Sequence, residues 1–261
     1  MNFPKSIETI LGDRPYSFNT IGMSSAQVIC YEDVVLKIEK QSEESDKELQ
    51  MMEWLSDKLP VPQVLCSEKE NDMSYLLMSK ISGEISCSSK IIENPKHLVK
   101  MLAEGLRMLW KTDITTCPYN NSIDNKLRLA EIRVRNNLCD TEDAEPGTFG
   151  ANGFESPEKL LEWLKRNRPE EELVFSHGDY CLPNIMIKDN KINGFIDLGR
   201  SGIADKYQDI ALCYRSLKHN FDGSYGGKVY EDFDALMLFD ALQIDPDWDK
   251  IKYFILLDEL F

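Results

Sequence analysis

The sequence contains no long uninterrupted run of apolar residues. No stretch of about 18 or more occurs among its 261 residues, so no transmembrane helix is expected. Its first residues, Met1 to Ser6, lack the apolar core of a signal peptide. These absences predict a cytoplasmic protein that has no membrane partner.

The cysteines show no pairing pattern. There are seven, which is an odd number; they are scattered along the chain, and no CxxC motif occurs. This excludes a disulfide framework and a zinc site built on closely spaced cysteines. The sequence therefore predicts reduced thiols.

Positive charge is in deficit. Lys and Arg number 30 against 45 Asp and Glu, which gives a formal net charge of -15. This charge argues against a nucleic-acid partner, because binding to a phosphate backbone depends on basic residues. It is compatible with a cationic partner, which an acidic surface attracts.

The most informative stretch lies between residues 173 and 200. Short apolar runs at 173–175, 185–187 and 192–198 predict buried strands around a polar loop. That loop contains His177, Asp179 and Asn184 in the pattern H-x-D-x-x-x-x-N, and Asp197 follows on the last strand. The spacing matches the phosphoryl-transfer layout of kinases, in which one Asp accepts the hydroxyl proton and an Asn and a second Asp hold magnesium.

The residue types suit that chemistry. Magnesium prefers hard oxygen ligands, which the amide of Asn184 and the carboxylate of Asp197 provide. The alternative is a turn in which Asp and Asn act only as caps. That alternative explains Asp179 or Asn184 singly but does not explain the whole set.

A first lobe is expected over residues 1–81. A loop of small residues that includes Met23 and Ser24 precedes a predicted hairpin at 27–38, and such a loop can cover ATP phosphates. An ordinary hairpin is the alternative. Lys37 shares a strand face with Val35, and Glu48 lies on the inner side of a predicted helix at 43–59. A lysine–glutamate pair of this kind orients lysine onto phosphates, whereas a solvated surface pair is the alternative.

A mainly helical second lobe is expected over residues 82–261. A strand at 74–78 precedes the crossing to it, where Met78 can line an adenine pocket or belong to the core. Helices are predicted to begin at Pro95 and Pro157, and to cover 123–138, 205–217, 228–242 and 246–260, with a long loop at 141–153. Asp209 is expected to be an interior residue that hydrogen-bonds the catalytic loop.

These residues resemble the aminoglycoside 3'-phosphotransferases, the kanamycin kinases, over nearly the full length. The similar segments are 22–24, 51–55, 58–62, 76–79, 169–179, 196–202 and 251–261. The resemblance implies an α+β, two-lobed protein-kinase-like fold. It also implies transfer of the ATP γ-phosphate to a drug hydroxyl with Mg2+.

The resemblance also implies roles for individual residues. Asp179 matches the general base, and Asn184 and Asp197 match the metal ligands. The positions that match the nucleotide site are Met23, Ser24, Val35, Lys37, Glu48, Met78, Ser79 and Ile81. The positions that match the aminoglycoside pocket are Arg200, Arg215, Asp258, Glu259 and the carboxylate of Phe261, and one acid of the loop after Thr141, namely Glu142, Asp143 or Glu145, is expected to join them. For Arg200 and Arg215 the alternative is that they mainly hold neighbouring carboxylates.

The chain departs from the family pattern at two places. Val35 stands where related enzymes can stack an aromatic ring on adenine, so GTP is expected to compete with ATP. The segment 146–154 contains no acidic residue, so fewer ammonium contacts are expected there. Two other functions remain open: a kinase of another amino-alcohol or sugar amine, and a pseudokinase that binds nucleotide without turnover.

Overall fold

The computed structural model describes residues 3–19, 26–225 and 227–261. The chain forms two compact units, each built from two separate pieces. Unit 1 comprises Met1–Met101 with Leu182–Ser201, and unit 2 comprises Leu102–Cys181 with Gly202–Phe261. The predicted phosphate loop at Met23 and Ser24 lies outside the described residues. The functional division of the chain after Ile81 stays a prediction. No helix in the described ranges is long and apolar enough to cross a membrane.

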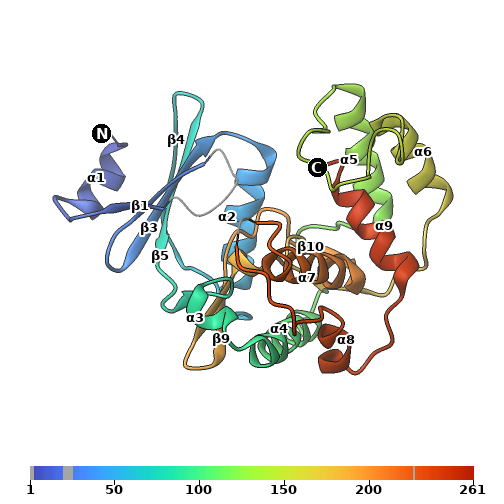
Figure 1. Cartoon of the computed structure of the whole chain (residues 1–261). Coiled ribbons are helices and arrows are strands. Elements are labelled where there is room, and N and C mark those ends of the chain that lie inside the picture. The colour runs from blue at the N-terminus through green and yellow to red at the C-terminus, as the bar shows by residue number, and fades with distance from the viewer. Residues whose placement is uncertain (1–2, 20–25, 226) are drawn as a thin grey trace. The chain divides into compact units, whose positions relative to one another are not determined.

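Unit 1 is built on an antiparallel sheet in the order β1-β2-β3-β5-β4 (Figure 1). Its strands are β1 (Ser17–Asn19), β2 (Gln27–Cys30), β3 (Val34–Lys40), β4 (Val64–Glu70) and β5 (Met73–Ser79). The strands predicted within 27–38 and 74–78 are confirmed as β2, β3 and β5. The strands β1 and β4 and the helix α1 (Lys5–Leu11) had not been predicted.

The alternation of β3 assigns a different helix to each sheet face. Val34, Leu36 and Ile38 are buried in one cluster with Ile7 and Leu11 of α1. The intervening residues of β3 point to the other face, since successive strand residues alternate. On that face Lys37 reaches Glu48 of α2 (Glu43–Leu55). Helices α1 and α2 therefore cover opposite faces of the sheet.

Helix α2 begins at a capping box and ends earlier than predicted. The hydroxyl of Ser42 accepts from the backbone N–H of Ser45 at 3.0 Å, and the Ser45 hydroxyl caps Ser42 in return. The prediction that the helix continues to Leu59 was wrong, because α2 ends at Leu55 and a turn follows. Leu59 is nevertheless buried, so the apolar spacing predicted its burial correctly but overestimated the length of the helix.

A smaller sheet completes unit 1 in the order β6-β8-β9. Its strands are β6 (Glu84–Ile85), β8 (Ile185–Lys188) and β9 (Lys191–Phe195), with the short helices α3 (Ser89–Ile92) and η1 (Leu182–Asn184) nearby in sequence. The predicted strand at 192–198 ends at Phe195 instead. Asp197 adopts a left-handed backbone with φ of 60°, which does not continue an extended strand.

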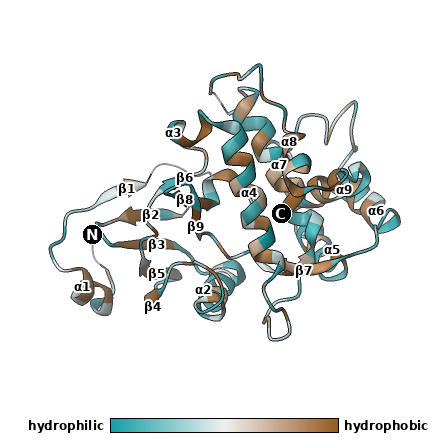
Figure 2. Cartoon of the chain, turned by 90° about the horizontal axis from the view of Figure 1, so that it is seen from below, coloured by the Kyte–Doolittle hydropathy of each residue, from teal (hydrophilic) through white to brown (hydrophobic). Residues whose placement is uncertain are grey.

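Unit 2 is mainly helical. Its elements are α5 (Ile123–Arg135), α6 (Pro157–Arg166), α7 (Lys206–Phe221), α8 (Met237–Leu242), α9 (Trp248–Asp258) and the antiparallel pair β7 (Leu173–Ser176) and β10 (Gly202–Asp205), while α4 (Pro95–Trp110) spans the boundary between the units. Trp163 of α6 packs on Tyr253 of α9 with ring centroids 6.3 Å apart. Figure 2 shows many hydrophilic residues on α6, as expected for a helix that buries one face only.

The helix predicted at 228–242 was mostly wrong. Residues 228–236 form turns and irregular structure, and within the predicted span only Met237–Leu242 is helical. Phe233 stacks on Phe221 at 3.7 Å between ring centroids, and Tyr230 meets the same ring edge-on at 5.0 Å. Tyr230 and Phe233 thus pack against Phe221 from a segment that is not helical.

Candidate active site

Lys37 lies at the centre of an ion cluster in unit 1. Its Nζ is 2.7 Å from Glu48 Oε2, 3.2 Å from Asp197 Oδ1 and 3.7 Å from Glu39 Oε1. Burial alone would lower the pKa of Lys37, but these carboxylates, Glu48 first, raise it above its usual value. Burial also raises the pKa of Glu48, and the ammonium of Lys37 opposes that rise. Lys37 is therefore a fixed cation on the sheet face that α2 covers.

Asp197 and Asn184 are brought near one another by the backbone. The Ile196 N–H donates to the Asn184 carbonyl at 3.0 Å, so the residue before Asp197 is bound to the 3-10 turn that carries Asn184. Asp197 has a left-handed backbone, and its side chain is about half exposed. Such a conformation is disfavoured for a non-glycine residue and occurs more often at functional sites.

The inner sheet face beside Lys37 is aliphatic. Val35 pairs with Cys30 on β2 and with Met78 on β5. Tyr31 packs in the opposite core cluster with α1, so its ring cannot supply a stacking surface on the Lys37 face. The structure therefore offers no aromatic substitute for Val35 on β2 or β3.

Three further residues that the sequence predicted for the nucleotide or substrate site, Ser79, Ile81 and Arg200, have structural partners. The hydroxyl of Ser79 accepts from the backbone N–H of Gln63 at 2.8 Å. Ile81 packs against Gly194 so closely that a Cβ on that glycine would lie 2.7 Å from the isoleucine. Arg200 donates through Nε to Glu44 Oε1 at 3.2 Å, so in unit 1 it contacts a carboxylate.

The loop that carries Asp179 is held by one buried carboxylate in unit 2. Asp209 of α7 accepts from the backbone N–H of His177 at 2.8 Å and of Gly178 at 2.9 Å. Gly178 has φ of 81°, a conformation that favours glycine. Asp179 follows at a half-buried position. The predicted interior role of Asp209 is confirmed.

Four of the predicted substrate residues form one cluster in unit 2. Arg215 of α7 lies 2.5 Å from Asp258, 3.0 Å from Glu259 and 3.7 Å from Glu145. The backbone N–H of Glu145 also donates to Glu259 at 2.9 Å. Three carboxylates thus surround one guanidinium, which leaves an excess of negative charge when all three are ionised.

The burial of this cluster affects its titration. Desolvation raises the pKa of Glu259 to about 7, although the Glu145 amide and Arg215 act in the opposite direction. Burial alone would lower the pKa of Arg215, but the nearby acids, Asp258 first, together raise it above its usual value. Glu259 therefore changes charge near neutral pH.

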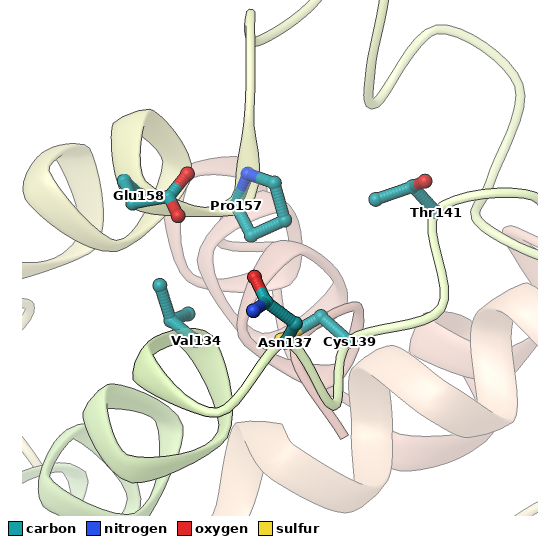
Figure 3. Close-up of a pocket in the computed structure, with 6 residues that line it drawn as sticks. All are labelled: Val134, Asn137, Cys139, Thr141, Pro157 and Glu158. Carbon is teal, nitrogen blue, oxygen red and sulfur yellow. The ribbon is translucent and has the colours of Figure 1, made fainter.

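A cavity of about 300 Å³ lies elsewhere in unit 2 (Figure 3). It is lined by residues at the end of α5, in the following loop and at the start of α6, namely Val134, Asn137, Cys139, Thr141, Pro157 and Glu158. None of the residues predicted to bind nucleotide, metal or substrate lines it.

Several contributors to these clusters were not found from the sequence. Glu39 joins Lys37, Glu44 binds Arg200, and His219 Nε2 lies 3.2 Å from Glu145. Glu39 could have been found, since it lies two residues after Lys37 on one strand face. The other two depend on contacts between segments far apart in sequence.

An antiparallel sheet with a buried lysine–glutamate pair, an Asp near the lysine and a mainly helical second unit together define a protein-kinase-like phosphotransferase. The chain belongs to the phosphotransferase enzyme family, whose family model matches residues 19–254. The predicted α+β protein-kinase-like class is confirmed by this membership and by solved structures of similar fold.

Individual relatives agree with the family. An aminoglycoside 3'-phosphotransferase of Enterococcus faecalis is 45% identical over 220 residues, which cover 83% of this chain and 78% of the relative. The crystal structure of an aminoglycoside-3'-phosphotransferase of type VIII has a TM-score of 0.79 at 24% identity, covering 98% of this chain and 97% of that one. An aminoglycoside phosphotransferase of Streptomyces rimosus, solved with ADP and streptomycin, has a TM-score of 0.79 at 23% identity and covers 97% and 95%.

Proposed function

We propose that this enzyme transfers the γ-phosphate of ATP to the 3'-hydroxyl of an aminoglycoside antibiotic and thereby confers resistance. The observation that carries the proposal is the Lys37 cluster with Glu48 and Asp197, in a chain 45% identical to an aminoglycoside 3'-phosphotransferase. A structural relative solved with ADP and streptomycin supports both classes of ligand.

Lys37 binds the nucleotide phosphates in this proposal, and Glu48 holds its ammonium in place. The amide of Asn184 and the carboxylate of Asp197 are hard oxygen donors that fit Mg2+. The described residues contain no group of three or more His, Cys, Asp or Glu that could hold a metal ion. When bound, Mg2+ would neutralise charge on the transferred phosphoryl group.

Asp179 orients the acceptor hydroxyl and receives its proton. The bonds from His177 and Gly178 to Asp209 fix the backbone immediately before Asp179, so the carboxylate starts from a defined position. The acidic cluster of Glu145, Asp258 and Glu259 supplies the negative charge that attracts ammonium groups.

The proposal is tested by phosphate transfer to matched acceptors. Purified protein with ATP or GTP and Mg2+ should phosphorylate kanamycin B, whereas tobramycin, which lacks the 3'-hydroxyl, should not react. NMR of the product should place the phosphate at the 3' position. Equal reaction of tobramycin would refute the 3' assignment. Reaction of choline alone would support a different small-molecule kinase, and no turnover with any acceptor would support a pseudokinase.

Introducing an aromatic ring on the Lys37 face should strengthen ATP binding. Stacking contributes about 0.5–1.5 kcal/mol, so Val35→Tyr is expected to lower the KM for ATP by about twofold to tenfold. Val35→Leu, which adds bulk without stacking, is the matched control. Steady-state kinetics with ATP and GTP measure the effect. An equal gain from leucine would show that the missing interaction is not stacking.

A further inference from the structure

Arg133, near the end of α5, binds the backbone of the segment that follows α9. Its Nε donates to the carbonyl oxygen of Leu260 at 2.7 Å, and its Nη2 donates to the main-chain oxygen of Phe261 at 2.7 Å. The same Nη2 donates to the Leu138 carbonyl at 2.8 Å. The Phe261 ring centroid lies 5.7 Å from the guanidinium carbon and 5.1 Å from Lys126 Nζ.

This arrangement differs from an ordinary surface ion pair. Two donors in a rigid planar fork reach the main-chain oxygens of two consecutive residues, which constrains the direction of the chain and not only its distance. Leu260 and Phe261 follow directly on the end of α9, where the helix dipole favours a cation. Arg133 places its guanidinium there.

The segment held in this way contains two of the acids of the Arg215 cluster. Arg215 contacts the side chains of Asp258 and Glu259, and Arg133 fixes the backbone of the next two residues. Arg215 thus binds the side-chain carboxylates of residues 258 and 259, and Arg133 binds the main-chain oxygens of residues 260 and 261. A segment fixed before binding loses less conformational entropy when a ligand arrives.

The same arginine also holds the start of the loop that carries Glu145. Its bond to the Leu138 carbonyl fixes the chain just before Cys139, whose thiol lies 3.5 Å from the Leu260 carbonyl. Both polypeptide segments that bring acids to Arg215 therefore meet at Arg133.

We propose that Arg133 is a positioning residue for the acceptor substrate: through the main-chain oxygens of Leu260, Phe261 and Leu138 it sets the placement of Asp258, Glu259 and Glu145, and so the affinity for the polycation. This inference rests on the proposed function. It assigns Arg133 no role in the chemical step or in nucleotide binding.

The first test separates affinity from chemistry. Arg133→Gln should raise the KM for kanamycin B by about tenfold, the effect of losing one charge-assisted hydrogen bond, with kcat changed less than about twofold and the KM for ATP unchanged. Arg133→Lys keeps the positive charge but loses the planar fork, and should show a smaller rise. The matched control is Arg135→Gln on the same helix, because that exposed arginine is paired with Glu131 of its own helix. An unchanged KM for kanamycin B, or a loss confined to kcat, would overturn the inference.

The second test does not depend on the reaction. Hydrogen exchange of the peptide 256–261 should accelerate in Arg133→Gln and remain unchanged in Arg135→Gln. Unchanged exchange in Arg133→Gln would overturn the inference, and so would faster exchange with an unchanged KM. If the wild-type enzyme phosphorylates no aminoglycoside, the proposed function fails, and the role of Arg133 in substrate affinity fails with it. The exchange result then still shows whether Arg133 holds residues 260 and 261 in place. If Arg133→Gln does not fold, Arg133→Lys decides by the same two measurements.

Discussion

Asp179→Asn is expected to lower kcat for aminoglycoside phosphorylation by about a hundredfold to ten-thousandfold, the range of a general base. Asparagine keeps the size of the side chain but cannot accept the proton of the attacking hydroxyl. The fold should survive, since Asp209 holds the loop through the backbone N–H groups of His177 and Gly178 and not through the Asp179 side chain.

The KM for ATP should change little in Asp179→Asn, because the proposed nucleotide contacts come from Lys37 and its partners. Steady-state kinetics with saturating kanamycin B and varied ATP measure kcat and the KM for ATP separately, and calorimetric binding of a nucleotide checks that affinity independently. Asp189→Asn is the matched control, since Asp189 lies in the β8–β9 turn with a left-handed backbone that asparagine tolerates. A kcat within tenfold of wild type would remove Asp179 from the chemistry.

Local patterns in the sequence were sufficient for the strands β2, β3 and β5 and for the residues of the motif. The alternation in β3 identified the face of Lys37, and the four-residue spacing from Glu48 to Met52 identified the inner side of α2. Both patterns follow from backbone geometry, so they are visible in a short window of sequence. The same reasoning placed Asp209 inside unit 2, where it is fully buried.

The missed features depend on partners far along the chain. Strand β4 has only half-buried and exposed residues, and its sequence V-L-C-S-E-K-E alternates too weakly to be distinguished from a loop. Arg133 looks like a solvated helix residue, because the carbonyls that it binds lie 127 and 128 residues away. The helix prediction for residues 228–236 was wrong for a related reason. The aromatic residues of this region pack on Phe221, which is distant in sequence, and do not form one face of a helix.

Removing the cation at the centre of the acidic cluster should be strongly destabilising. Arg215→Met is expected to lower the free energy of unfolding by about 3–5 kcal/mol, because breaking a buried ion pair leaves an uncompensated charge. The Arg215 side chain is only 16% exposed, and those of Asp258 and Glu259 are 11% and 6% exposed, so solvent screens these charges weakly. Urea unfolding at neutral pH measures the change, and Arg215→Lys, which keeps the charge but loses the fork, should lose less.

The loss of unfolding free energy caused by Arg215→Met should increase with pH. The pKa of Glu259 is raised in the folded state from 4.5 to about 7, so between those values the folded protein binds more protons than the unfolded chain. Its contribution to stability is therefore greatest at low pH and is lost as pH rises through about 7. Without Arg215 one attraction that lowers this pKa is gone, and ionised Glu259 becomes more costly. Unfolding at about pH 5 and about pH 8 should show the smaller penalty at the lower pH, and an equal penalty at both would contradict the prediction.

The double variant Arg215→Met with Glu259→Gln separates stability from recognition. Neutralising Glu259 removes one of the charges that Arg215 compensated, so part of the lost stability should return, and the double-mutant cycle gives the coupling between the two. Affinity for kanamycin B should not return, because the cluster has then lost one of the carboxylates proposed to attract the drug and the arginine that held the remaining two in place. If both the free energy of unfolding and the affinity for kanamycin B recover, the cluster stabilises the fold and does not bind the substrate. If stability recovers and affinity does not, the negative charge of the cluster contributes to substrate binding.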